Sequence, residues 1–269
     1  MRIPRRLTKL LLAVVGVWIA LCALAWMFQE RLMFFPGPPP KLTPQAAGLA
    51  FETVELAAAD GTKLHGWWIE APHPTRSVVV FHGNAGSVEN RLDLALLFHG
   101  FGWSTLLFDY RGFGLSSGSP SVAELALDAD AAFDWAAARS PGLPLVAWGE
   151  SLGGGVAAEL STRRAVAVLV LEKSFTALGD IAASAYPFLP VRWLLRTDLQ
   201  TRTALGHSNA AVFVLHGRDD RVVPFAHGKR LFEAAREPKE LCEFRGGHND
   251  RAWAKDPAIL ARLRQFVAR

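Results

Sequence analysis

Apolar and polar positions follow three different patterns along the chain. The first is an uncharged, mostly apolar stretch at 10–28. Two segments in which apolar and polar residues alternate, 51–56 and 63–69, come next and flank the pair Asp60-Gly61. Alternation around such a pair predicts a β-hairpin. Farther along the chain, short continuous apolar runs alternate with helix-like segments. Runs of this kind are typical of parallel strands buried on both faces.

These runs predict strands, and the segments around them predict helices. The expected strands are 77–81, 104–108, 145–148, 166–171, 212–216 and 241–244, and the expected helices are 90–98, 122–139, the segment after Ser151, and 257–267. Strands that alternate with helices indicate an α/β fold with a mostly parallel central sheet and helices on both faces. Ligands of such sheets bind at the carboxyl ends of the strands, so catalytic residues are expected in the loops that follow them.

The uncharged stretch predicts a membrane anchor. As a helix, the stretch from Leu10 to Phe28 is about 28 Å long, close to the thickness of the hydrocarbon core of a bilayer. Four basic residues precede it, namely Arg2, Arg5, Arg6 and Lys9. The positive-inside rule therefore places the N-terminus in the cytoplasm and the rest of the chain on the extracytoplasmic, periplasmic side. A cleaved signal peptide is the alternative, but the stretch is long for one and no small-x-small cleavage site is evident before Pro36.

The chain is expected to have three parts. Residues 1–30 form the cytoplasmic tail and transmembrane anchor, 31–50 a Pro-rich linker, and 51–269 the folded domain. Within the linker, the sequence Pro-Gly-Pro-Pro-Pro at 36–40 predicts a stiff, extended spacer that holds the domain away from the bilayer.

Charge and cysteine content exclude some classes of function. The 269 residues include 29 Lys and Arg against 25 Asp and Glu. The basic cluster before the anchor accounts for the excess, so the remainder is neutral and no nucleic-acid surface is expected. Cys22 and Cys242 are the only cysteines. We therefore expect no disulfide within the chain, and no cluster of Cys and His predicts a metal site.

A Gly-x-Ser-x-Gly motif at 149–153 supplies a candidate nucleophile, Ser151. An apolar strand precedes it and a helix-like segment follows. A serine on a sharp strand-to-helix turn exposes its hydroxyl at the edge of the sheet, where N–H groups of the new helix face any oxyanion. The same motif occurs around Ser116, but the strand before it ends at Phe108 and several residues intervene. Ser116 is therefore expected in a loop.

A nucleophilic serine needs a general base and a carboxylate that orients the base. His248 follows the last expected strand, in a loop that begins with Gly246-Gly247. Asp219 and Asp220 both follow the strand at 212–216, and spacing does not choose between them. The order serine, acid, histidine along the chain is one of the known orders of a catalytic triad.

The oxyanion of the intermediate needs two N–H donors. The loop His-Gly-Asn-Ala-Gly at 82–86 follows the first long strand. We expect one donor from this loop, with Asn84 the first choice and Ala85 the alternative. The backbone N–H of Leu152 is the expected second donor.

With these motifs, the chain from about Leu32 to its end resembles the membrane-anchored α/β-hydrolase-domain serine hydrolases. The resemblance rests on five motifs: HGNAG at 82–86, DYRGFG at 109–114, GESLGG at 149–154, His216-Gly217 with Asp220 and Val223-Pro224, and GGHND at 246–250. In that family the acid lies four residues after the strand-end histidine and four before the proline. The resemblance therefore implies Asp220 rather than Asp219.

The resemblance also implies a function, the hydrolysis of carboxylic esters or thioesters of acyl chains without a cofactor. It assigns Ser151 as nucleophile, His248 as base, Asp220 as orienting acid, and the N–H groups of Asn84 and Leu152 as oxyanion donors. A serine peptidase of the prolyl-oligopeptidase type shares this catalytic domain, but it usually carries a large gating domain. A non-enzymatic anchored scaffold is a third alternative, whose signature would be a missing triad residue.

A short cap over the site is expected at 174–207, between two strands. It contains the apolar segments 186–191 and 193–195. These predict either a lid that lines an acyl pocket or touches the bilayer, or ordinary packing of the cap on the core.

Overall fold

The computed structural model describes residues 4–269, so Arg2 of the basic cluster lies outside the described residues. Its centre is an eight-stranded sheet in the order β10-β9-β8-β7-β4-β6-β3-β2. The strands are β2 Glu52–Ala57, β3 Lys63–Ile69, β4 Arg76–Phe81, β6 Trp103–Phe108, β7 Leu145–Glu150, β8 Val168–Glu172, β9 Ala211–Gly217 and β10 Lys239–Phe244. β2 and β3 form the expected antiparallel hairpin, β3 is also antiparallel to β6, and the other neighbours are parallel. The predicted mostly parallel sheet is therefore confirmed.

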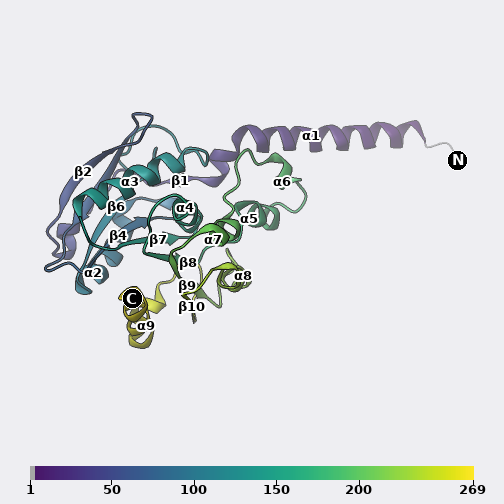
Figure 1. The fold of residues 1–269 in the computed structure, drawn as a ribbon. Coiled ribbons are helices and arrows are strands. Elements are labelled where there is room, and N and C mark those ends of the chain that lie inside the picture. Colours follow the sequence, from purple (N-terminus) through teal and green to yellow (C-terminus); the bar gives the residue numbers. More distant parts are fainter. Residues whose placement is uncertain (1–3) are drawn as a thin grey trace.

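Helices cover both faces of the sheet (Figure 1). The helices are α1 Arg5–Met33, α2 Leu92–Gly100, α3 Leu125–Arg139, α4 Leu152–Leu160, α5 Leu178–Ala185, α6 Val191–Leu194, α7 Thr201–His207, α8 Ala226–Ala234 and α9 Pro257–Val267. One apolar core joins the sheet to α3, α4 and α8, and a second joins its other face to α2 and α9. Three short 3-10 helices lie at Pro44–Ala47, Val88–Arg91 and Ala252–Lys255. α3 begins at Leu125, three residues later than expected, and residues 122–124 form a turn in which the Glu124 N–H bonds the carbonyl of Ser121 at 3.2 Å.

The sheet has a point where the direction of winding changes. β4 lies between β6 and β7, so the chain leaves it for one side of the sheet and returns on the other. In open α/β sheets ligands bind outside the carboxyl ends of the strands at such a switch point. Here that position lies between the loop after Phe81 and the turn after Glu150.

The start of the expected linker is bound to the domain. Phe34 is buried, and its ring packs edge-to-face against Phe113 at 6.1 Å between centroids. β1 (Phe35–Pro36) pairs in parallel with β5 (Ala85–Gly86). Apolar burial and backbone pairing therefore connect this segment to the domain, and the role of 36–40 as a spacer from the bilayer stays a prediction.

α1 projects from the domain, and the cap lies beside its C-terminal part (Figure 1). The cap connects β8 to β9 and consists of α5, α6, α7 and their loops. α1 has a kink at Phe28, whose backbone is non-helical (φ −110°, ψ 17°). Within residues 4–269, α1 is the one helix long and apolar enough to span a bilayer.

Candidate active site

Ser151 occupies a sharp turn between β7 and α4, as its motif predicts. Its backbone has φ 52° and ψ −112°, a conformation that non-glycine residues rarely adopt. The Ser151 N–H bonds the carbonyl of Glu172 on the neighbouring strand at 2.9 Å. A Cβ atom on Gly149 would lie 2.4 Å from the Cα atom of Gly154. The turn can therefore close only where both flanking positions lack bulk, and it presents the serine hydroxyl at the edge of the sheet.

His248 lies between the candidate nucleophile and a buried carboxylate. Its Nε2 atom is 3.0 Å from Ser151 Oγ, and its Nδ1 atom is 2.8 Å from Asp220 Oδ2. The other oxygen of Asp220 accepts hydrogen bonds from the N–H groups of Val222 and Val223, at 2.9 and 2.8 Å. All distances suit a relay of hydrogen bonds from carboxylate to imidazole to hydroxyl.

The structure distinguishes the two candidate acids. The Asp220 side chain is buried against His248, whereas Asp219 is exposed to solvent. Burial alone raises the pKa of Asp220, but the hydrogen bonds from His248, Val223 and Val222 outweigh it and lower that pKa below its usual value. Asp220 is therefore ionised near neutral pH, as an acid that stabilises an imidazolium must be.

A buried ionic network lies beneath the serine and holds the loop of His248. Arg251, three residues after the histidine, pairs with Glu150 at 3.1 Å. Arg91 pairs with the same carboxylate at 3.1 Å. Burial raises the pKa of Glu150, but the charges of Arg91 and Arg251 outweigh it and lower the pKa to about 2. The ammonium of Lys173 donates to the carbonyl of Asp250 at 2.9 Å. Glu150 and Lys173, from two other segments, thus hold the loop through Arg251 and the carbonyl of Asp250.

Asn84 and Leu152 lie where the oxyanion donors were expected. Both line one cavity together with Ser151 and His248, whereas Ala85 does not. Among the described residues, neither backbone N–H has a hydrogen-bond acceptor. The side chain of Asn84 is held by the carbonyl of Met33 at 2.7 Å, and its own carbonyl accepts from the Phe35 N–H at 2.8 Å. Segment 33–35 thus fixes this loop, a contact that the sequence did not indicate.

The cavity above Ser151 is mostly apolar. Its volume is about 420 Å³. Besides the polar groups already described and Asn249, the residues that line it are Leu32, Met33, Phe35, Phe175, Leu178, Ile181, Ala182, Ala185, Tyr186, Val222 and Val223. They come from the end of α1, from the cap and from the loop of the acid. The cavity can therefore hold a hydrocarbon chain with its reacting end at the hydroxyl.

The hydroxyl of Ser116, the serine of the second motif, is hydrogen-bonded to backbone groups. Its hydroxyl donates to the carbonyl of Asp109 at 2.7 Å and accepts from the His65 N–H at 2.9 Å. The strand-end histidines His82 and His216 also contact the backbone, at 2.7 Å from the Gly83 carbonyl and 2.8 Å from the Val223 carbonyl. The contacts of Ser116 agree with the loop position predicted for it.

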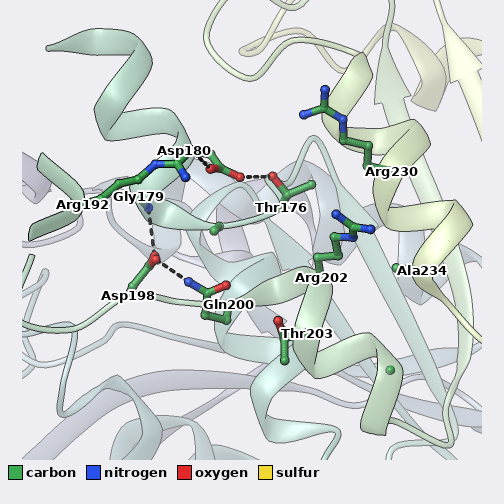
Figure 2. Close-up of a pocket in the computed structure, with 12 residues that line it drawn as sticks. Thr176, Gly179, Asp180, Arg192, Asp198, Gln200, Arg202, Thr203, Arg230 and Ala234 are labelled. Atoms are coloured by element: carbon green, nitrogen blue, oxygen red, sulfur yellow. Dashed lines mark hydrogen bonds and ion pairs between the residues drawn. The ribbon is translucent and has the colours of Figure 1, made fainter. Parts of the chain in front are cut away.

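A second hollow, of about 640 Å³, is lined by Thr176, Ala177 and Gly179 (Figure 2), whereas Phe175 and Leu178 of the same segment line the cavity over Ser151. Its polar groups bond one another: Asp180 pairs with Arg192 at 2.6 Å and accepts from the Thr176 hydroxyl at 2.6 Å. No serine, cysteine or histidine lines it. Elsewhere in the described part of the chain, no three His, Cys, Asp or Glu residues are placed to hold a metal ion. The chemistry of the site thus resides in the cavity over Ser151.

Comparison with known proteins places the chain in a family. A family model described as serine aminopeptidase S33 matches residues 72–194. An uncharacterized protein of Mycobacterium tuberculosis is 38% identical over 249 residues, covering 90% of this chain and 88% of the relative. The α/β-hydrolase domain-containing protein WAV2 of Arabidopsis thaliana is 31% identical, with 88% and 86% covered. The lysophosphatidylserine lipase ABHD12 of Mus musculus is 31% identical over 76% of this chain and 58% of its own length.

Solved structures agree on the fold. The esterase Pf2001 of Pyrococcus furiosus superposes with a TM-score of 0.71 at 22% identity, covering 87% of this chain and 98% of the esterase. The esterase Est1E of Butyrivibrio proteoclasticus, with bound ferulic acid, gives 0.65 at 16% identity, covering 79% and 97%. With the sheet, the turn at Ser151 and these relatives together, the chain belongs to the α/β-hydrolase family.

Proposed function

We propose that the protein is a membrane-anchored serine hydrolase that cleaves carboxylic ester or thioester bonds of acyl substrates. One observation carries the proposal: His248 lies within hydrogen-bond distance of both Ser151 Oγ, at 3.0 Å, and Asp220 Oδ2, at 2.8 Å. This pairing occurs at the carboxyl edge of the sheet, beside an apolar cavity.

In the first half of the reaction, Ser151 becomes acylated. His248 Nε2 accepts the hydroxyl proton while Oγ adds to the carbonyl carbon of the substrate. The carbonyl oxygen becomes an oxyanion, which accepts hydrogen bonds from the N–H groups of Asn84 and Leu152. Asp220 stabilises the imidazolium through Nδ1. Collapse of the intermediate breaks the bond to the alcohol or thiol, and His248 gives this leaving group its proton.

In the second half, water restores the enzyme. His248 accepts a proton from water as the oxygen adds to the acyl carbon of the ester on Ser151. The same two N–H groups stabilise the second oxyanion. Collapse breaks the bond to Oγ, the serine recovers its proton from His248, and the carboxylic acid leaves. The chain's own residues supply every proton transfer in this scheme.

The lining of the cavity supports an acyl chain as the group that is recognised. Aliphatic and aromatic side chains cover most of it, and no carboxylate is among the residues that line it. An aminopeptidase, which the description of the matching family model names, needs a polar or anionic group to bind the α-amino group of its substrate. The esterase and lipase relatives agree better with this apolar surface than a peptidase does.

α1 supports the anchored state. Its side chains from Leu10 to Ile19 are exposed and mostly apolar in the described structure. Ten consecutive exposed residues of this kind in water would be costly, and a bilayer removes that cost. We propose that α1 spans the membrane once, with the N-terminus in the cytoplasm and the domain on the extracytoplasmic side.

The test is hydrolysis by the full chain in detergent, compared with Ser151→Ala and with Ser116→Ala. The two serines occupy the same five-residue motif, so the second variant is a matched control. Wild type and Ser116→Ala should cleave p-nitrophenyl esters and an acyl thioester, and Ser151→Ala should not. Faster cleavage of a dipeptide amide than of the esters would favour a peptidase instead. Ester hydrolysis that survives in Ser151→Ala would contradict the proposal.

A further inference from the structure

We propose that residues 181–195, named here the cap strip, enter the bilayer beside α1, and that the cavity over Ser151 receives its acyl chain from that leaflet. The inference rests on the proposed function, which supplies the spanning helix and the reacting serine. It adds a second element that contacts lipid and the direction from which the substrate arrives.

The cap strip is bonded to the apolar part of α1. The indole N–H of Trp18 donates to the carbonyl of Phe188 at 2.9 Å. Gln29 donates to the carbonyl of Leu194 at 3.3 Å and accepts from the Arg196 N–H at 3.0 Å. The strip thus runs along α1 from near its C-terminal end back toward the middle of the uncharged stretch, as Figure 1 shows for α6.

This placement sets the depth of the strip. Trp18 precedes Phe28, the last residue of the uncharged stretch, by ten positions. At 1.5 Å per residue that is about 15 Å along the helix, roughly half the thickness of a hydrocarbon core. Tilt of α1 reduces this depth, but the bond from Trp18 keeps Phe188 beside the uncharged stretch of the helix. If α1 spans the bilayer, the strip therefore lies within the bilayer as well.

The side chains of the strip suit lipid better than water. Trp193 and Phe188 are 90% and 61% exposed, and Tyr186 is also exposed. From 181 to 195 the sole charged residue is Arg192, which pairs with Asp180 at 2.6 Å. Exposed aromatic rings with few charges are typical of surfaces at the interface of a bilayer.

The backbone of the strip is also largely satisfied. The N–H groups of Tyr186, Leu189 and Leu195 bond the carbonyls of Ala182, Tyr186 and Val191, at 2.9, 3.0 and 2.9 Å. Pro187 and Pro190 have no N–H to satisfy. The Phe188 carbonyl, at the turn of the strip, takes the bond from the Trp18 indole. Non-helical backbone is tolerated at membrane depth only where its polar groups are paired in this way.

An apolar route joins the strip to the reacting serine. A small cavity of about 70 Å³ lies between α1 and the strip. It shares Leu32, Met33, Ala182 and Tyr186 with the cavity over Ser151. Gln29 is the one residue among its lining with a polar amide. A lipid tail can therefore pass between the helix and the cap without meeting a charge. The polar hollow of Figure 2 shares no lining residue with this route.

The depth of the strip can be measured on the full chain in lipid vesicles. In a Cys22→Ala background, with Cys242 buried, a fluorophore is attached to Phe188→Cys, Val14→Cys or Leu96→Cys, whose native side chains are 61%, 58% and 50% exposed. Val14 reports the anchor and Leu96, on α2, reports the domain. Quenching by lipids brominated in their tails is compared with quenching by iodide in the buffer. We expect tail bromines to quench positions 14 and 188, and iodide to quench position 96.

Other outcomes overturn the inference in distinguishable ways. Tail quenching at 14 with iodide quenching at 188 places the strip in water and leaves the anchor standing. A label at 188 that neither agent quenches is covered by protein rather than lipid. Quenching by iodide at position 14 would show that α1 does not span the bilayer. This result would contradict both the proposed topology and this inference.

The direction of substrate entry needs a second measurement with the Phe188→Gln/Trp193→Gln double variant. Neither side chain lines the cavity over Ser151. Hydrolysis of a long-chain ester embedded in the vesicles should fall about tenfold, as expected for the loss of one or two kcal/mol of aromatic burial. Hydrolysis of a short, water-soluble ester should stay unchanged. An equal effect on both esters would contradict entry from the leaflet, and no hydrolysis of either by wild type would contradict the proposed function alone.

Discussion

At the residue scale, the surroundings of Ser151 and Asp220 maintain an unusual backbone conformation and a buried negative charge, both of which the proposed reaction uses. Ser151 keeps a backbone conformation that is unfavourable for a side chain, and the bond from its N–H to Glu172 helps to hold it there. Asp220 keeps its negative charge although it is buried, because three donors face its two oxygens. Such states persist only where the surroundings determine them. The neighbouring Asp219 has no such surroundings, and the two residues therefore offer a direct comparison.

Replacing Asp220 by Asn should lower kcat for ester hydrolysis by about 10³-fold or more, because an amide cannot stabilise the imidazolium and favours the wrong tautomer of His248. Asp219→Asn changes the same atoms one position earlier and should retain wild-type kcat. Kinetics on a p-nitrophenyl ester in detergent measures both. Equal losses in the two variants would show that the acid has been assigned to the wrong residue.

Asp109 should make stability depend on pH. Burial raises its pKa to about 7, although the Val88 N–H lowers it, and one of its oxygens has no partner among the described residues. In the unfolded chain its pKa is near the ordinary value of ~3.9. Between about pH 4 and 7 the folded state thus holds a proton that the unfolded state has lost, and stability falls as pH rises, by up to ~1.4 kcal/mol per unit.

Asp109→Asn removes the titrating carboxyl group, so the stability of the variant should fall less steeply as pH rises. Thermal unfolding in detergent from pH 4.5 to 7.5 compares the two proteins, and the difference in Tm, variant minus wild type, should grow with pH. A constant difference would mean that the carboxyl titrates normally in the folded protein.

At the scale of elements, the turn between β7 and α4 depends on missing side chains. A Cβ atom on Gly153 would lie 1.9 Å from the carbonyl oxygen of Phe81, which belongs to β4. α4 therefore approaches β4 more closely than any residue other than glycine at position 153 would allow. Gly206 in α7 is a contrast, because no heavy atom lies within 4 Å of its Cβ position.

Gly153→Ala should lower the free energy of unfolding by about 3 kcal/mol, since a backbone carbonyl cannot move aside cheaply. Gly206→Ala should raise it by about 0.5–1 kcal/mol, because alanine favours a helix. Urea unfolding of the detergent-solubilised proteins gives both values. The same change in the free energy of unfolding in both variants, or no change in Gly153→Ala, would show that α4 is not packed this closely against β4.

The sequence predicted the elements that have a local pattern of their own. The run at 145–148 is continuous and apolar, and it became β7; the Asp60-Gly61 pair marked the hairpin of β2 and β3. Contacts between distant segments were not predictable. The network of Arg91, Glu150 and Arg251 joins a 3-10 helix, the end of β7 and the loop after β10, and no local pattern marks its members as partners.

Two other features needed more than local spacing. Spacing left Asp219 and Asp220 equal, the family resemblance implied Asp220, and the 2.8 Å distance from His248 to Asp220 agrees with it. Composition alone suggested a spacer at 36–40, but it did not reveal that Phe34 is buried in the domain and that Phe35–Pro36 pair with Ala85–Gly86.

At the scale of the whole molecule, α1 and the domain that carries Ser151 are joined by direct contacts. The end of α1 lines the cavity over Ser151, and the Met33 carbonyl accepts a hydrogen bond from the Asn84 side chain. The cavity over Ser151 therefore lies beside the C-terminal end of the helix proposed as the anchor. In the proposed function, this position suits substrates that reside in or at the bilayer.

The proposed topology predicts which residues a membrane-impermeant maleimide can reach from outside spheroplasts. In the Cys22→Ala background, Leu96→Cys should be labelled before lysis and Thr8→Cys only after it. Thr8 precedes the uncharged stretch, and Leu96 is exposed on the domain. Labelling of Thr8→Cys in intact spheroplasts, with Leu96→Cys protected, would reverse the topology.

The central claim is that Ser151 is the nucleophile, and covalent capture tests it most directly. The detergent-solubilised protein is treated with a fluorophosphonate, digested with trypsin and analysed by tandem mass spectrometry. Cleavage after Arg111, Arg139 and Arg163 places Ser116 and Ser151 in different peptides, 112–139 and 140–163. We expect one phosphonyl group, on Ser151, that is absent from His248→Ala protein. An adduct on Ser116 or another residue, or none on folded wild-type protein, would contradict it.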